Sequence, residues 1–239
     1  MKASYGIDGP NAIRGLLLGA FGLWFFGALI NFFALKLTLS QALIDGLWWP
    51  SFCIISIFLM LLSSFFGKFV MRDQLITDLK IQGDEKILDV GCGRGLLLIK
   101  AAKKLNTVKA IGLDTWSQND LSNNLAKNTL LNAEIENVSD KIELITGNMT
   151  TMHFNDNSFD IVVSSMAIHN LPTISQREKA IQEINRVLKP GGRIALLDFI
   201  YTKDYLNEFE KLGWRDIQLS SRCFWQFPPI KILTGKKPV

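Results

Sequence analysis

Hydrophobic positions divide this chain of 239 residues into two parts with different patterns. Residues 15–37 carry no charge before Lys36, and residues 47–67 form a second long apolar run. Each run has about 20 residues, enough to cross a hydrocarbon core of about 30 Å at a rise of about 1.5 Å per residue. Because both runs are apolar on all sides, they favour transmembrane helices over helices that bury one face in a soluble core. Residues 1–72 are therefore predicted to form a two-helix membrane anchor, with a connector near Thr38–Gly46.

The remaining residues, 73–239, alternate short apolar runs with helical patterns. This alternation predicts a mostly parallel sheet with helices on both faces, and ligands bound beyond the carboxyl ends of the strands. The helical patterns predict helices at 95–104, 118–131, 176–188 and 203–212. The apolar runs predict strands at 86–90, 109–113, 141–145, 159–164, 193–198, 215–220 and 230–235.

Charges around the two apolar runs predict how the anchor is oriented. The connector carries one acid, Asp45, and Lys36 can extend along the end of the first helix to reach water. Positive residues favour the cytoplasmic side, so both termini and the domain at 73–239 are predicted to be cytoplasmic. A cleaved signal peptide is the competing interpretation of the first run, although the apolar core is long for one. The basic residues on the side of the termini are Lys2, Arg14, Lys68 and Arg72.

Three local features of the apolar runs suggest how the helices pack. Gly15 and Gly19 form a pair of small residues one turn apart, which suits close contact either within the hairpin or between two copies of the chain. Asn31 is a polar side chain inside the first run and is expected to make an interhelical hydrogen bond rather than to touch a substrate. Trp48 and Trp49 stand where an aromatic belt at a membrane interface would place them.

Charge and cysteine content exclude several classes of function. Of the 26 basic and 22 acidic residues, five and two respectively lie in residues 1–72, so the domain that follows is nearly neutral. The domain therefore offers no general electrostatic reason to bind nucleic acid. The three cysteines are scattered and the two histidines have no neighbour at ligand spacing, so neither a disulfide framework nor a metal site is expected.

The sharpest local motif is a strand that ends in an acid and three alternate glycines. Residues 87–95 read Ile-Leu-Asp-Val-Gly-Cys-Gly-Arg-Gly. Glycines at this spacing let a strand turn sharply into a helix and let the backbone approach a ligand closely. Asp89 can accept hydrogen bonds or pair with a cation, and Asp114 ends a second apolar run about 20 residues later, the usual reach to a ribose hydroxyl. The three glycines are Gly91, Gly93 and Gly95.

Two further motifs follow in order, the apolar strand at 159–165 and a Leu-Lys-Pro-Gly-Gly turn within 187–199. Together the four motifs resemble those of class I S-adenosylmethionine-dependent methyltransferases, specifically the small-molecule branch, over roughly residues 72–239. The resemblance implies a Rossmann-like α/β fold with seven strands in the order 3-2-1-4-5-7-6, the seventh strand antiparallel. It also implies S-adenosylmethionine as the cofactor.

The resemblance assigns roles to individual residues of the site. The glycines should line the methionine moiety, Asp89 should lie near its charged end, and Asp114 should accept the ribose hydroxyls. Asn148 stands where the family usually has an acid facing the adenine amino group, so its amide oxygen could accept a hydrogen bond without the strength that a charge adds. Trp116 could lie against adenine or plug the crevice, and Met149 could contact the ring or pack in the core. The residues assigned to the cofactor are Asp89, Gly91, Cys92, Gly93, Gly95, Asp114, Thr115, Trp116, Asn148, Met149 and Ser164.

Candidate groups for the acceptor side follow the fourth strand. Methyl transfer depends on positioning and on exclusion of water, and it needs a general base only when the nucleophile arrives protonated. His169 could be such a base, a hydrogen-bond donor to the substrate, or a structural imidazole. His153 lies in a polar loop and is expected to be solvated. The aromatic segment Arg222–Pro229 could cap the pocket, dock on the membrane or cover the edge of the sheet.

These observations lead to one main hypothesis and two alternatives. The main hypothesis is a membrane-anchored methyltransferase that acts in the cytosol on a small apolar or membrane-partitioning acceptor, such as a lipid, a quinone-like ring or a thiol. The alternatives are a catalytically silent cofactor-binding subunit of a membrane assembly, and a protein methyltransferase. The expected partners are the acceptor, the bilayer and, if the transmembrane helices homodimerise, a second copy of the chain.

Overall fold

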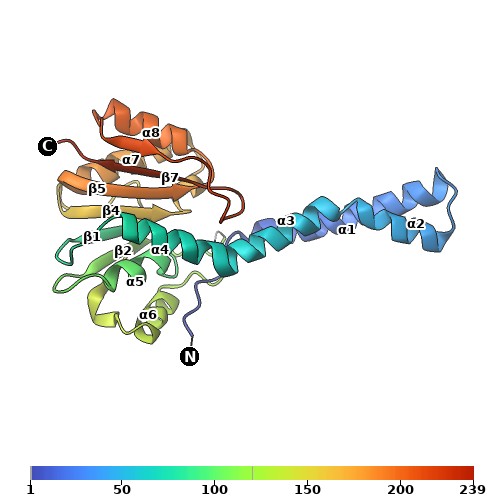
Figure 1. Cartoon of the computed structure of the whole chain (residues 1–239), viewed down its shortest axis with the longest axis horizontal. Helices are drawn as coiled ribbons and strands as arrows, with labels where there is room; N and C mark the ends of the chain where they lie inside the picture. The colour runs from blue at the N-terminus through green and yellow to red at the C-terminus, as the bar shows by residue number, and fades with distance from the viewer. Residues whose placement is uncertain (1, 120) are drawn as a thin grey trace.

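The computed structural model describes residues 2–119 and 121–239. A seven-stranded sheet lies between two layers of helices, and a pair of long helices projects from one end of it (Figure 1). The strand order is β3-β2-β1-β4-β5-β7-β6; the first five strands are parallel, and β7 runs antiparallel to both of its neighbours. The predicted order and the antiparallel seventh strand are therefore confirmed. The strands are β1 (Ile87–Val90), β2 (Ala110–Asp114), β3 (Ile142–Thr146), β4 (Phe159–Ser165), β5 (Leu188–Asp198), β6 (Ile217–Leu219) and β7 (Lys231–Lys236).

Helices cover both faces of the sheet because its central strands are apolar on both sides. Every residue of β1 and of β2 is buried, which is the pattern of strands in a covered parallel sheet. One face packs against α4, α5 and α6, and the other packs against α7 and α8. The covering helices are α4 (Lys68–Asp78), α5 (Leu96–Ala102), α6 (Ala126–Ile135), α7 (Ile174–Val187) and α8 (Thr202–Lys211), with single turns η3 (Ser139–Lys141) and η4 (Ile168–Asn170).

Two predicted elements of this domain need correction. The helix predicted at 118–131 begins only at Ala126, because polar side chains of the preceding loop bind the backbone instead of leaving it to a helix. Asn124, for example, donates to the carbonyl of Ser117 at 3.0 Å. The strand predicted at 193–198 begins earlier, at Leu188, which pairs with Phe159 before the register shifts. The other strands and helices of the domain lie within about three residues of their predicted bounds.

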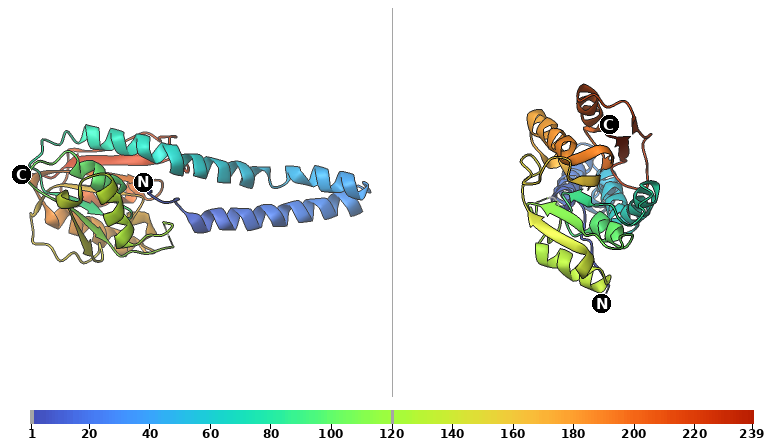
Figure 2. Two further views of the ribbon diagram at one scale, coloured as in Figure 1. Left: turned by 90° about the horizontal axis from the view of Figure 1, so that it is seen from below. Right: turned by 90° about the vertical axis from the view of Figure 1, so that its left-hand side faces the viewer.

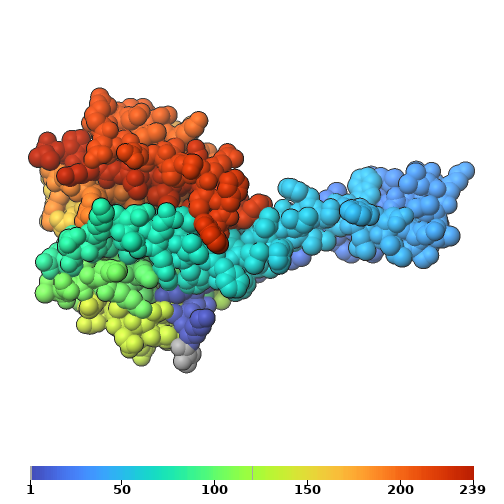
Figure 3. Space-filling model, in the orientation of Figure 1, coloured from blue at the N-terminus to red at the C-terminus, as the bar shows by residue number. Residues whose placement is uncertain are grey.

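The projecting pair consists of two long antiparallel helices that stand clear of the sheet domain (Figures 2 and 3). The first was predicted at 15–37 but starts at Pro10, a favourable first residue because its missing N–H would have had no helical partner. The second was predicted at 47–67 but starts after Pro50 and continues as one helical run to Asp78. The elements are α1 (Pro10–Phe33), α2 (Leu39–Asp45), η1 (Gly46–Trp48), α3 (Ser51–Leu62) and the π-helical turn η2 (Ser63–Gly67), which leads into α4.

The connector between these helices is itself structured. Thr38 accepts a hydrogen bond from the backbone of Gln41, and the Gln41 side chain accepts one from the Thr38 backbone, so a capping box starts α2. Asn31 donates to the carbonyl of Ala42 at 3.5 Å, which confirms the expected hydrogen bond between helices. A Cβ added at Gly27 would overlap the ring of Trp49, so the far end of the hairpin is closely packed.

The two long helices are long and apolar enough to cross a membrane, by length and composition. They are α1 and the continuous run Ser51–Asp78. Only 22% and 28% of their most apolar stretches are buried inside the structure, so most of this apolar surface faces outward. Gly15 and Gly19 also face outward, because no heavy atom of the described residues lies within 4 Å of an added Cβ at either position. This excludes packing within the hairpin as the reason for this pair.

The first residues of the chain pack against the sheet domain, a segment that we call the N-terminal strap (residues 3–8). Ser4 and Asn132 exchange two hydrogen bonds of 2.9 Å, and the N–H of Ile7 donates to Ser122 at 2.8 Å. Asp8 forms a β-bridge with Leu121. The chain therefore starts on the domain, leaves it as α1 and returns as α3, and the predicted domain boundary at residue 72 falls inside α4.

Candidate active site

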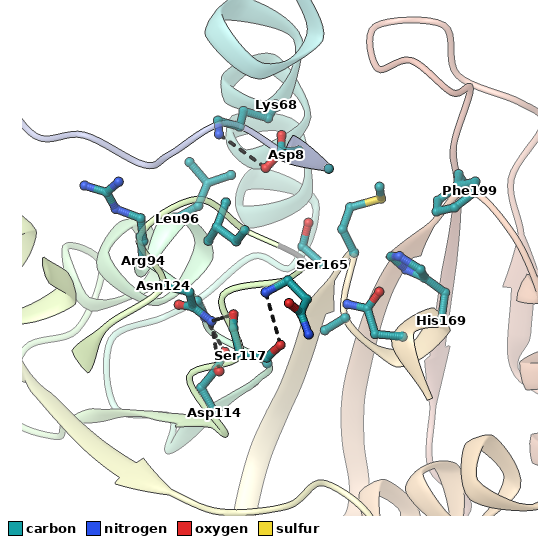
Figure 4. Close-up of a pocket in the computed structure, with 18 of the residues that line it drawn as sticks. Asp8, Lys68, Arg94, Leu96, Asp114, Ser117, Asn124, Ser165, His169 and Phe199 are labelled. Carbon is teal, nitrogen blue, oxygen red and sulfur yellow. Dashed lines mark hydrogen bonds and ion pairs between the residues drawn. The ribbon is translucent and has the colours of Figure 1, made fainter. Parts of the chain in front are cut away.

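A cavity of about 910 Å³ opens at the carboxyl ends of β1, β2 and β4 (Figure 4). Ligand pockets typically measure about 300–1,000 Å³, so this one has room for two partners of moderate size. Its walls come from the glycine turn after β1, the loop that follows β4, the N-terminal strap and the base of the projecting helices. The predicted position of the site, at the carboxyl ends of the strands, is therefore where the cavity lies.

The glycine turn borders the cavity with bare backbone. Gly91 and Gly93 have φ of 73° and 51°, in the left-handed region that favours glycine. The N–H groups of Gly91 and Cys92 both donate to the carbonyl of Leu113, at 2.7 and 3.2 Å. The N–H of Gly93 donates to the carboxylate of Asp114 at 2.7 Å. These bonds fix the turn against the end of β2.

Replacing Gly91 by alanine is expected to destabilise the fold by about 2 kcal/mol more than replacing Gly213, because overpacking adds to the strain of a positive φ. A Cβ at Gly91 would overlap the Cβ of Ala167, whereas Gly213 has φ of 89° and no described heavy atom within 4 Å of an added Cβ. Urea unfolding of the two variants measures the difference. Equal losses of stability would show that the turn can yield at Gly91.

Asp89 lies on the cavity wall as a buried carboxyl group. Its Oδ2 accepts a hydrogen bond of 2.9 Å from the N–H of Leu98 in the first turn of α5. The pKa of Asp89 is raised to about 8, mainly by burial and in smaller part by the nearby charge of Asp114, while the bond from Leu98 opposes the rise. A cation placed in the cavity would favour the ionised form of this carboxyl group.

Asp114 ties together three segments around the cavity. Besides Gly93, its carboxylate accepts hydrogen bonds from the N–H of Trp116 at 2.6 Å and from the amide of Asn124 at 3.2 Å. Cys92 lies on the wall beside it, and burial raises the pKa of this thiol well above its ordinary value. A protonated buried thiol is a poor nucleophile, so Cys92 acts here as packing.

Of the other residues assigned to the cofactor, three more line the cavity and three do not. Thr115, Asn148 and Met149 are on the wall. The amide oxygen of Asn148 already accepts two hydrogen bonds of 2.9 Å, from the N–H and the hydroxyl of Thr150. Its two lone pairs are thus used within the chain, contrary to the expectation that this oxygen would be open to adenine.

Among the described residues, Gly95, Trp116 and Ser164 do not line the cavity. Gly95 caps α5 with φ of 82°. The indole of Trp116 donates to Thr146 at 2.8 Å, so the side chain fixes the end of β3. Ser164 is buried and donates to the carbonyl of Val90 at 2.7 Å, while the next residue, Ser165, lines the cavity.

His169 faces the cavity from η4 (Figure 4), and the buried carboxylate of Asp198 lies beside its ring. Its Nδ1 lies 2.7 Å from Oδ1 of Asp198, which leaves Nε2 as the ring nitrogen that can meet a ligand. Asp198 also accepts from the N–H of His169 and from the hydroxyl of Tyr205, each at 3.2 Å. The ring packs edge-on against Phe199, with 4.7 Å between centroids. His153, the other histidine, is exposed, as predicted.

Sequence reasoning missed the residues that the strap and the helices contribute. Lys68 is buried, and its Nζ donates to the carbonyls of Tyr5 and Gly6 at 3.1 and 2.6 Å and to Asp8 at 3.4 Å. Asp8 also accepts from the hydroxyl of Ser64 at 3.3 Å, and both Asp8 and Lys68 line the cavity. The sequence does mark these two residues, because Asp8 and Lys68 are charged side chains next to long apolar runs that contain few other charges.

One part of the aromatic segment Arg222–Pro229 lines the cavity, and another part is exposed. Gln226, Phe227 and Pro228 line the cavity, which is the position that capping, one of the three roles left open, requires. Phe224 and Trp225 point outward, 78% and 62% exposed. A Cβ added at Gly67 would overlap the carbonyl of Trp225, so the segment packs directly on η2.

Sequence comparison agrees with this geometry. A family model described as a methyltransferase domain matches residues 88–196. Demethylmenaquinone methyltransferase of Lactobacillus johnsonii is 33% identical over 144 residues, which are 60% of this chain and 54% of that protein. The enzyme of the same name from Staphylococcus aureus is 35% identical over 130 residues, 54% of this chain and 49% of that protein. The chain thus spans about half the length of the curated relatives it matches.

Solved structures share the fold at low sequence identity. The cyclase SpnF superposes with a TM-score of 0.57 and 18% identity, over 72% of this chain and 81% of that one. A methyltransferase dependent on S-adenosylmethionine from Mesorhizobium loti gives 0.54 and 16%, over 69% of this chain and 96% of that one. Because one of these proteins is a cyclase, the fold alone does not decide the reaction. Residues 88–196 are therefore similar to a methyltransferase domain, and the glycine turn, Asp114 and the strand at 159–165 lie within the matched range.

Proposed function

We propose that this protein transfers a methyl group from S-adenosylmethionine to a small acceptor that partitions into membranes, of which a quinone-like ring is the leading candidate. One observation carries the proposal: a single cavity joins the glycine turn to the base of two long, outward-facing apolar helices. The names of the matched relatives, demethylmenaquinone methyltransferases, support a quinone-like acceptor.

The proposal includes a membrane anchor at residues 1–72, with the catalytic domain at 73–239 and both termini in the cytoplasm. Exposed Trp48 and Trp49 lie at the far end of the hairpin and suit one membrane interface. Exposed Phe224 and Trp225 lie beside η2, at the end of the helices nearest the domain, and suit the other. The outward-facing pair of small residues in α1 is open to a second copy of the chain, which supports a homodimer.

The described residues fit S-adenosylmethionine. The positive-φ glycines Gly91 and Gly93 let the cofactor approach the backbone, and the buried carboxyl of Asp89 suits a cationic end. Asp114 stands at the end of β2, where ribose hydroxyls are expected. When bound, S-adenosylmethionine supplies a methyl group that its sulfonium makes electrophilic. The residues proposed to hold it are Asp89, Gly91, Cys92, Gly93, Asp114, Thr115, Asn148 and Met149.

On the acceptor side, His169 is proposed to take up at Nε2 the proton of the acceptor hydroxyl, which a quinone-like ring carries in its reduced, hydroquinone form, or of a thiol. Asp198 holds the ring by its contact with Nδ1 and stabilises the imidazolium that results. Gln226 and Phe227 cover the cavity and exclude water. The protein forms no covalent bond to either partner in this scheme, so its contribution is positioning, proton transfer and exclusion of water.

The test is incubation of the detergent-purified protein with methyl-labelled S-adenosylmethionine and a membrane extract, followed by separation of organic, volatile and aqueous products. Label in the organic or volatile fraction is expected. The Asp114→Ala variant with the same extract serves as the control for background transfer. Label confined to aqueous molecules or protein would overturn the proposed acceptor class. Binding of the cofactor without label in any fraction would instead indicate a catalytically silent subunit.

A further inference from the structure

The cavity extends beyond the methyltransferase domain into the hairpin, along a groove between α1 and α3. Ala12 and Leu16 of α1 and Phe52, Ser56 and Met60 of α3 line its outer part. We call these five residues the helix window. Four of its five side chains are apolar, so the groove offers hydrocarbon surface that is continuous with the cofactor end of the cavity.

The helix window is bounded at both ends by close packing. Among the described residues of α1, only Gly27, Ala28 and Asn31 are buried. These three lie toward the far end of the hairpin. Gly27 fits against Trp49 there. At the other end Lys68 ties the strap to the base of the helix pair. Between these two contacts α1 has no buried residue, whereas Cys53 and Ser56 of α3 are buried, so the groove is open mainly along α1.

The inner end of the window is polar. Asp8 lies there with its Oδ1 3.4 Å from Lys68 Nζ and its Oδ2 3.3 Å from the Ser64 hydroxyl. Both contacts are long, and the side chain of Asp8 is 32% exposed, so the carboxylate can accept another hydrogen bond from the cavity. A ligand in this groove would therefore place an apolar part among Leu16, Phe52 and Met60 and a polar part near Asp8.

We propose that the helix window admits the apolar tail of the acceptor sideways from the bilayer, so that the ring reaches the methyl donor while the tail stays between α1 and α3. This inference rests on the proposed function and adds the path and the binding site of the tail. Its physical reason is that each methylene drawn from hydrocarbon into water costs free energy, which a groove continuous with the membrane avoids. Asp8 then meets the polar ring at the inner end of the groove.

The proposal predicts where a photoreactive tail will attach. The probe is a quinone analogue with a long alkyl tail that ends in a benzophenone, added with S-adenosylmethionine to the full chain in lipid nanodiscs. Cross-links are expected at the five residues of the helix window and are mapped by mass spectrometry. Leu16→Trp should reduce the cross-link yield about tenfold. The larger indole fills the groove, and overpacking of this kind weakens binding of the tail by about that factor. Met60→Trp tests the opposite wall in the same way.

Matched controls keep the readout specific. Leu17→Trp and Ile55→Trp make comparable changes on the same helices at exposed positions that do not line the cavity, and both should leave the cross-link yield unchanged. Cofactor binding by calorimetry should be unaffected in all four variants, which shows that they fold. Cross-links spread over the lipid-facing surface, or equal losses at Leu16 and Leu17, would overturn the proposal.

Methyl transfer, measured in parallel, separates this inference from the proposed function. Turnover by Leu16→Trp is measured with two acceptors, one with a tail and one without. If it falls equally for both, the window is not the path of the tail, although the protein remains a methyltransferase. Cross-links in the window without methyl transfer to any acceptor would uphold the binding site and refute the proposed activity.

Discussion

Replacing Asp114 by alanine is expected to weaken S-adenosylmethionine binding by about 2 kcal/mol, roughly thirtyfold in Kd. The carboxylate is proposed to accept the ribose hydroxyls, and it also holds the N–H groups of Gly93 and Trp116 at 2.7 and 2.6 Å. Alanine therefore removes a charged contact to the ligand and leaves two backbone donors beside the cavity without this partner. Both effects act on the cofactor end of the site, so the loss should appear in binding before any acceptor is added.

Calorimetric titration with S-adenosylmethionine measures this effect. Asp114→Asn should give an intermediate loss, because its single amide oxygen replaces only part of the carboxylate. Asp140→Ala removes an exposed acid on η3 and should bind the cofactor as the unaltered protein does. Unchanged affinity in Asp114→Ala would refute the assignment of the ribose site.

Replacing His169 by alanine should lower kcat about a hundredfold and leave cofactor affinity unchanged, since general bases contribute about 10²–10⁴-fold. The imidazole lies on the cavity wall with Nδ1 beside a buried acid, the arrangement that orients Nε2 toward an acceptor.

Steady-state rates with the acceptor found in the labelling experiment test this prediction. His153→Ala is the matched control, because it removes the only other histidine of the chain, which is exposed and lies off the cavity wall. Asp198→Asn should reduce kcat by a smaller factor, because the ring keeps its place but loses the charge that stabilises the imidazolium. Unaltered turnover in His169→Ala would leave the imidazole with a structural role.

The parts of the site that the sequence predicts well are those encoded by local motifs. The turn at residues 91–95 and the acid at the end of β2 follow directly from glycine spacing and from the end of an apolar run. Assignment of side chains within a strand is less secure, because neighbouring residues point to opposite faces. Ser164 was expected at the cofactor, yet it is buried against Val90 and Ser165 lines the cavity instead.

Contacts between distant segments could not be predicted in this way. Lys68 and Asp8 are 60 residues apart, and nothing in either local pattern indicates that they meet. The helix α2 is a different case, since Thr38-Leu-Ser-Gln41 is a capping-box pattern that was open to recognition. The helix α6 starts late because Asn side chains compete with it for backbone groups. The spacing of hydrophobic residues carries no information about such hydrogen bonds.

The N-terminal strap has a practical consequence for how this protein is prepared. A soluble fragment that begins at residue 73 would lack Tyr5, Asp8 and Lys68 and would leave Asn132 without Ser4. The cavity of this fragment would be open on one side, so ligand affinities measured on the fragment would not describe the whole protein. Val239 is fully exposed, so an affinity tag is better fused there than next to the strap.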